Sequence, residues 1–69
     1  MRLSARNIIK GKILEVTTGA TTAHVKIDVG GGTVITSSIT NEAVTALALK
    51  VGESAYAVIK ASDVMVGRD

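Results

Sequence analysis

The sequence of 69 residues is long enough for one domain, which we expect to span residues 1–69, and its formal net charge of +2 is too small to indicate a nucleic-acid partner. It contains no cysteine, which excludes disulfides and thiolate metal sites, and with His24 as its single histidine no site for a bare metal cation is expected. The start of the chain has no apolar signal region and no apolar run could span a bilayer, so we expect a cytoplasmic protein without membrane contact.

The hydrophobic residues predict a core that one chain completes only in part. They make up 46% of the sequence, yet only Tyr56 is aromatic, so valine, isoleucine, leucine and alanine must form the core. A domain near this size buries only about 60% of the surface that its unfolded chain exposes, and is therefore marginal alone. Several expected strands carry apolar residues on both faces. Since both faces need cover, the simplest second cover is another copy of the same chain.

Residues 8–18 are rich in β-branched side chains and predict the first strand. Its alternation changes phase near Ile13 and Leu14, which indicates a bulge or a strong bend. Gly11 lies inside this strand and fits the tight curvature of a barrel corner. The first strand is therefore expected to be sharply curved.

The second strand, expected at residues 21–29, has the cleanest alternation of apolar and polar side chains. The side chains expected to face inward are Ala23, Val25, Ile27 and Val29, and those expected to face outward are Thr22, His24, Lys26 and Asp28. Gly30–Gly32 predicts a hairpin, because glycine permits positive φ. A phosphate-cradling loop is not indicated, since such a loop opens a helix, whereas here a third strand is expected at residues 33–39.

The spacing of apolar residues changes after the third strand and predicts a short helix at residues 41–48, with Thr40 or Asn41 as its N-cap. Residues 54–60 predict a fourth strand, and residues 63–66 predict a short fifth one. The resulting order, β-β-β-α-β-β, is all-β with one short helix and predicts a five-stranded OB-type β-barrel. An antiparallel meander without a helix is the alternative.

Two short segments, one near each end of the chain, carry groups that bind anions. S-A-R-N at 4–7 offers a hydroxyl and the guanidinium of Arg6, and K-A-S-D at 60–63 offers the ammonium of Lys60 and a second hydroxyl. Thr40 lies at the expected start of the helix, where backbone N–H groups favour anions. These donors suit a doubly negative tetrahedral oxyanion, whose oxygens only accept hydrogen bonds. The alternative is that the serines cap turns and the two cations are ordinary surface charges.

The same two segments resemble the molbindins, the small Mop-type molybdate-binding proteins. The similarity begins with S-A-R-N-I-I-K-G-K at 4–12 and ends with A-V-I-K-A-S-D-V-M at 57–65. Between them it includes A-H-V-K-I-D at 23–28, V-I-T-S-S-I-T at 34–40 and A-L-A-L-K-V-G at 46–52. It covers nearly the whole chain in order, and the first and last motifs are specific in combination.

The resemblance implies an OB-type barrel that assembles into a homohexamer, a trimer of dimers, and stores or buffers molybdate or tungstate without an organic cofactor. One class of site is then shared by two chains and uses Ser4, Ala5, Arg6, Thr40, Lys60, Ala61 and Ser62. A second class of oxyanion site, near the threefold axes, is placed near Ala20 and Thr22. Some relatives have a serine where this chain has Ala43, which removes one potential hydrogen bond, worth about 1 kcal/mol.

Three other functions fit the residues less well. An OB-type module that binds single-stranded nucleic acid needs several aromatic stacking platforms and a basic groove, and this sequence has one tyrosine. An enzyme is not expected, because a Ser-His-Asp triad would depend on His24, in the middle of a strand on its polar face. A regulatory module of a larger transporter or transcription factor is the third alternative, whereas this chain is expected to act on its own.

Overall fold

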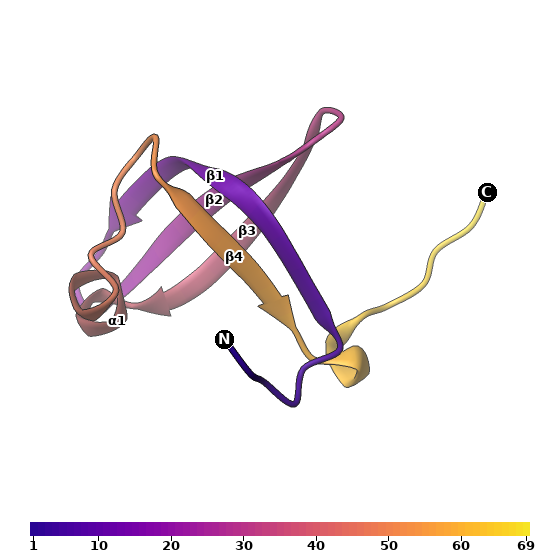
Figure 1. Cartoon of the computed structure of the whole chain (residues 1–69). Coiled ribbons are helices and arrows are strands. Elements are labelled where there is room, and N and C mark those ends of the chain that lie inside the picture. Colours follow the sequence, from indigo (N-terminus) through magenta and orange to yellow (C-terminus); the bar gives the residue numbers. More distant parts are fainter.

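The computed structural model describes all 69 residues and consists mainly of one strongly curled antiparallel sheet (Figure 1). The four strands are β1 (Asn7–Thr18), β2 (Thr22–Gly30), β3 (Thr33–Thr40) and β4 (Ser54–Ile59), and they lie in the order β3-β2-β1-β4. Helix α1 (Asn41–Ala46) follows β3, and a 3-10 turn, η1 (Ala61–Asp63), follows β4. The prediction of a mostly β fold with one short helix after the third strand is confirmed.

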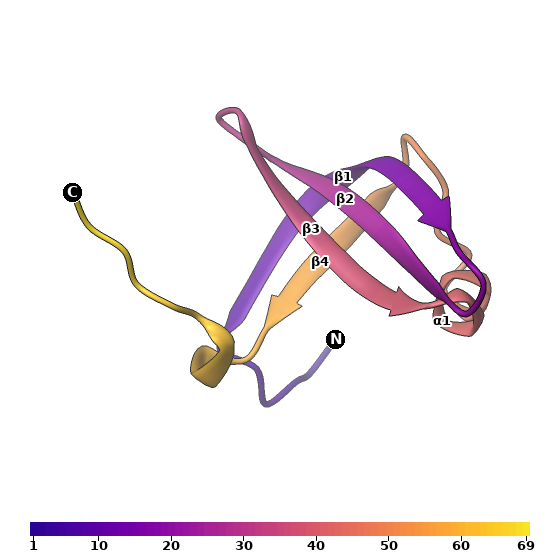
Figure 2. The same cartoon turned by 180° about the vertical axis from the view of Figure 1, so that it is seen from behind.

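The prediction of a fifth strand at residues 63–66 is wrong, because the structure has four strands. Asp63 ends η1, where its backbone N–H donates to Lys60 O over 2.9 Å. The chain beyond it then runs away from the body in both views (Figures 1 and 2). A strand needs a neighbour for its backbone N–H and C=O groups, and after this turn the tail reaches neither edge of its own sheet. The sheet therefore stays open between β3 and β4.

The bend of β1 comes from a β-bulge. The register between β1 and β2 shifts between Ile13 and Glu15, which leaves Leu14 as the extra residue. The first half of β1 pairs with β4 and its second half pairs with β2. The predicted irregularity at this position is thus confirmed, and it lets one strand serve both halves of the curled sheet.

The core lies inside the curl and is small. Its fully buried members are Ile13, Ala23, Val25, Ile27 and Ala57. Three of them belong to the predicted inward set of β2, whose fourth member, Val29, is half-buried. The outward-facing His24 and Lys26 on the same strand are exposed, so the predicted alternation is confirmed. Only five residues are buried while thirteen large apolar side chains stay exposed, so a single chain leaves many of its large apolar side chains in contact with water.

The predicted hairpin and helix start are also confirmed. Gly30, Gly31 and Gly32 have φ values of 95°, 62° and 82°, in the region that favours glycine. Thr40 is the N-cap of α1, and its Oγ1 accepts a hydrogen bond from the backbone N–H of Ala43 over 3.1 Å. Because this oxygen accepts from the helix, its own hydrogen can be donated elsewhere. With six residues, α1 is far too short to cross a membrane, and so is η1.

Gly11 of β1 lies tightly against β2. A Cβ atom at this position would lie 2.5 Å from Asp28 O and 2.6 Å from Ile27 Cγ2. Because Asp28 O belongs to the backbone, only a movement of the strands could relieve the clash. We expect Gly11→Ala to lower the free energy of unfolding by roughly 1–3 kcal/mol in urea denaturation. The matched control is Gly67→Ala, whose Cβ would meet open space, and an equal loss in both variants would contradict this account.

Candidate functional site

The structure brings the two donor segments together at one end of the sheet. Asn7 pairs with Ile59 in the register of β1 and β4, although 52 positions separate them in the chain. Arg6 directly precedes this pair and Lys60 directly follows it, so the two segments leave the sheet side by side (Figure 1). S-A-R-N and K-A-S-D therefore form one surface, which we call the terminal donor cluster.

The terminal donor cluster carries two cations, Arg6 and Lys60, that form no salt bridge, although Asp63 belongs to the same segment as Lys60. The one salt bridge in the chain joins Lys26 Nζ to Glu15 Oε2 over 3.5 Å, so Arg6 and Lys60 are both unpaired. Their side chains are exposed, as are the hydroxyls of the two serines in the same segments. Two like charges at one edge repel each other, and an anion between them would relieve that repulsion. The cluster can therefore bind a small anion with charged groups and hydroxyls together.

Thr40 lies far from this cluster in the same chain. It pairs with Thr22 across β3 and β2, and Ala20 lies in the turn just before Thr22. These three residues form a second group beside α1, at the opposite end of the sheet from η1 in both views (Figures 1 and 2). The length of β1, from Asn7 to Thr18, separates this second group from the terminal donor cluster. A site that uses both Thr40 and Arg6 must therefore combine two chains.

The turn at the second group is held by three hydrogen bonds. Gly19 N–H donates to Thr22 O over 2.8 Å, and Asn41 N–H donates to Thr21 O over 2.9 Å. The side chain of Asn41 adds a bond from Nδ2 to Gly19 O, also 2.9 Å. The sequence predicted for Asn41 only a role as helix cap, because nothing local in the sequence places the start of α1 against this turn.

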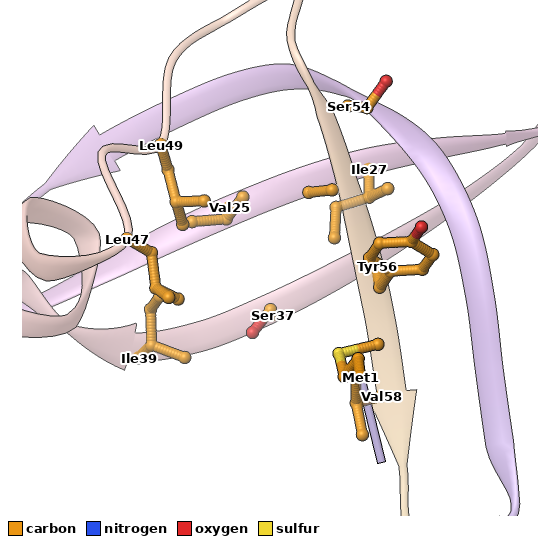
Figure 3. A pocket seen from close by; sticks show the side chains of 11 residues that line it. Met1, Val25, Ile27, Ser37, Ile39, Leu47, Leu49, Ser54, Tyr56 and Val58 are labelled. Atoms are coloured by element: carbon orange, nitrogen blue, oxygen red, sulfur yellow. The ribbon is translucent and has the colours of Figure 1, made fainter. Parts of the chain in front are cut away.

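An apolar groove of about 420 Å³ lies along the open side of the sheet (Figure 3). Figure 3 shows Tyr56, Val58 and Met1 on one side and Ile39, Leu47 and Leu49 on the other. The groove has no charged side chain in its lining, so it is unsuited to an oxyanion. It runs between β3 and β4, the two sheet edges, whose outer backbone groups have no strand partner. No groove was predicted from the sequence, because the five strands were expected to form a barrel.

Comparison with known proteins gives consistent matches over the whole chain. Residues 3–66 match the TOBE domain family. A probable molybdenum-pterin-binding protein from Haemophilus influenzae is 51% identical over 67 residues, which cover 97% of each chain. The structure of MopII from Clostridium pasteurianum is 40% identical, with a TM-score of 0.90, and the match covers 97% of this chain and 100% of that one.

A third match has a bound ligand. ModG, a cytoplasmic molybdate-binding protein solved with molybdate bound, is 55% identical with a TM-score of 0.89, over 94% of this chain and 46% of its own. The open curled sheet and its neighbours define an OB-type fold, as the order of strands and helix predicted. The chain belongs to the molbindin (Mop) family of TOBE domains, which confirms the resemblance seen in its two terminal motifs.

Proposed function

We propose that this chain, as a single domain over residues 1–69, binds molybdate or tungstate at sites shared between the subunits of a cytoplasmic homohexamer. Its role is then storage or homeostasis of the oxyanion. The observation that carries the proposal is the terminal donor cluster, in which Arg6 and Lys60 adjoin the Asn7–Ile59 pair and neither forms a salt bridge. The molybdate bound to the related ModG supports the choice of ligand.

The proposed capture uses hydrogen bonds assisted by charge. Arg6 and Lys60 neutralise the two negative charges, and exposed hydroxyls and backbone N–H groups complete the shell around the four oxygens. The contributing residues are Ser4, Ala5, Arg6, Lys60, Ala61 and Ser62 of one chain, with Thr40 of a neighbouring chain. All of these groups donate, which suits a dianion without a proton. Hydrogen phosphate carries a proton that a carboxylate accepts best, and the proposed contributors include no carboxylate, so we expect the site to favour molybdate over phosphate.

The assembly follows from the open side of the sheet and the free tail. Met65 and Val66 are 93% and 92% exposed, and Val64 has extended backbone angles of φ −89° and ψ 117°. An apolar extended tail and an apolar groove between two unpaired sheet edges are complementary. We propose that the tail of one chain fills the groove of its dimer partner as a fifth strand, reciprocally. Three such dimers then place Thr40 of one chain near Arg6 and Lys60 of another.

A second oxyanion site is proposed at the turn beside α1, near Ala20 and Thr22. The N–H of Ala20 and the hydroxyl of Thr22 take no part in the three bonds that hold the turn, so both are free to donate to a ligand. The position of this turn at one end of the sheet suits contacts between copies around a threefold axis. This site contains no cation from its own residues, so its affinity is expected to be lower than that of the terminal donor cluster.

Equilibrium dialysis with molybdate, sulfate and phosphate, combined with native mass spectrometry, tests the proposal directly. We expect uptake of molybdate in preference to phosphate by an assembly six times the 7.1 kDa mass of one chain. A monomer that takes up no oxyanion would contradict both parts of the proposal. Binding of single-stranded nucleic acid is the less favoured function, because Tyr56 is the only ring on which a base could stack.

A further inference from the structure

Two asparagine side chains hold the backbone next to the two proposed sites in the same way. Asn7 Nδ2 donates to Ile59 O over 3.2 Å, and Ile59 directly precedes Lys60. Asn41 Nδ2 donates to Gly19 O over 2.9 Å, and Gly19 directly precedes Ala20. Each amide therefore binds the carbonyl that stands immediately before a proposed donor residue.

The geometry of the peptide bond makes this arrangement effective. The C=O of one residue and the N–H of the next belong to one rigid plane, and in a trans peptide they point in opposite directions. A hydrogen bond to Gly19 O thus fixes the direction of the Ala20 N–H, and a bond to Ile59 O fixes that of the Lys60 N–H. The structure has no cis peptide bond, so this relation holds at both positions.

Asn41 holds the turn on both sides of Ala20. Its side chain binds Gly19 O, and its own backbone N–H binds Thr21 O over 2.9 Å. Glycine at position 19 has no Cβ to restrict its backbone. A hydrogen bond to Gly19 O therefore helps to hold the Ala20 N–H in one direction. The two bonds orient the peptide plane that precedes Ala20 and the one that follows Thr21, and they leave the Ala20 N–H unused.

Asn41 also carries an acceptor without a partner, which indicates that its N–H donor is the functional part of the side chain. Asn41 Oδ1 is buried and accepts no hydrogen bond. A buried acceptor without a partner lowers stability, and an apolar side chain of similar shape would avoid that loss. The amide at position 41 is therefore explained by its N–H donor rather than by its contribution to stability.

We propose that Asn7 and Asn41 are positioning residues, one for each class of oxyanion site, which orient the peptide N–H groups of Lys60 and Ala20. This inference rests on the proposed function. Neither asparagine contacts the ligand in this account, and each acts on its own site only. The two amides are at opposite ends of β1, which makes their effects separable.

The test measures molybdate uptake by equilibrium dialysis of the whole chain over a concentration range that resolves both classes of site. We expect Asn41→Ala to weaken the second class about three- to tenfold, the equivalent of one hydrogen bond, and to leave the first class unchanged. Asn7→Ala should weaken the first class to a similar extent and leave the second class unchanged. In an Arg6→Ala background, in which binding at the first class of site is largely lost, Asn41→Ala should reduce the remaining molybdate uptake. This selectivity distinguishes positioning from a general loss of structure.

Two further variants keep the test independent of folding. Asn41→Leu removes both the donor and the buried acceptor, so it should melt no lower than the unaltered protein and still lose second-class affinity. Thr45→Ala removes a 3.2 Å bond to Asn41 O from the same helical turn without touching Gly19, and its uptake should not change. The inference would be overturned if each asparagine variant weakened both classes of site equally, or if neither variant weakened either class. The proposed function would stand in both cases. No uptake by the unaltered protein would overturn both.

Discussion

Arg6→Ala and Lys60→Ala should each abolish most of the rise in melting temperature that molybdate causes in the unaltered protein. A ligand that binds only the folded assembly stabilises it by about 2.7 kcal/mol at 100 times its Kd. Removing one hydrogen bond to a charged group costs roughly 1.5–3 kcal/mol of binding, or about 10- to 150-fold in Kd. At the same molybdate concentration, little of the stabilisation would remain. Differential scanning calorimetry with and without molybdate measures the effect.

The control for this experiment is Lys10→Ala. Lys10 is an exposed cation on β1 that pairs with Tyr56, away from either end of the strand, so its removal should leave the rise intact. Without ligand, all three variants should melt close to the unaltered protein, because neither Arg6 nor Lys60 is in a salt bridge. Phosphate should hardly change any melting temperature. If molybdate raises it as much in both cluster variants as before, those two residues do not form the site.

Replacing two tail valines together, Val64→Ser with Val66→Ser, should break the assembly into smaller species. The two side chains lie two residues apart and so share one face of an extended segment. In the single chain both are exposed, at 49% and 92%, and their replacement would cost almost nothing there. In the proposed dimer both are buried in the partner's groove, where each valine contributes about 1.5–3 kcal/mol. We therefore expect the dissociation constant to rise at least about 100-fold.

Analytical ultracentrifugation over a range of protein concentrations measures this change. The matched control is Val51→Ser, which alters an exposed valine in the segment before β4 and does not line the groove. That variant should keep the mass of the unaltered protein. A tail variant that still sediments as the intact hexamer would show that the tail is not the strand that closes the barrel, and the groove would need another occupant.

Features that depend on neighbours along the chain were predictable. The alternation in β2 identified its buried residues, because side chains of a strand alternate between two faces. The glycines at 30–32 marked the hairpin, and Thr40 marked the start of α1, since both follow from local backbone and capping chemistry. The change of phase at Ile13 also located the bulge in β1.

The site was predictable in its chemistry but not in its grouping. The serines, Arg6 and Lys60 stood out as donors because each of the two short segments combines a hydroxyl with a cation. That Arg6 and Lys60 adjoin, however, follows from the pairing of Asn7 with Ile59. That Thr40 lies elsewhere follows from its pairing with Thr22. Register between distant strands depends on the packing of the entire sheet, and a local pattern does not contain it.

The sequence by itself thus determined the class of fold, the family and the kind of ligand that its donors suit. The tertiary structure decided that residues 63–66 form no strand within their own chain, that an apolar groove stays open, and that Asn41 holds the turn at Gly19. The physical reason is the same in each case. The residues of a segment set its capacity to form hydrogen bonds and apolar contacts. Which partner it contacts depends on the groups that lie within reach in the folded structure.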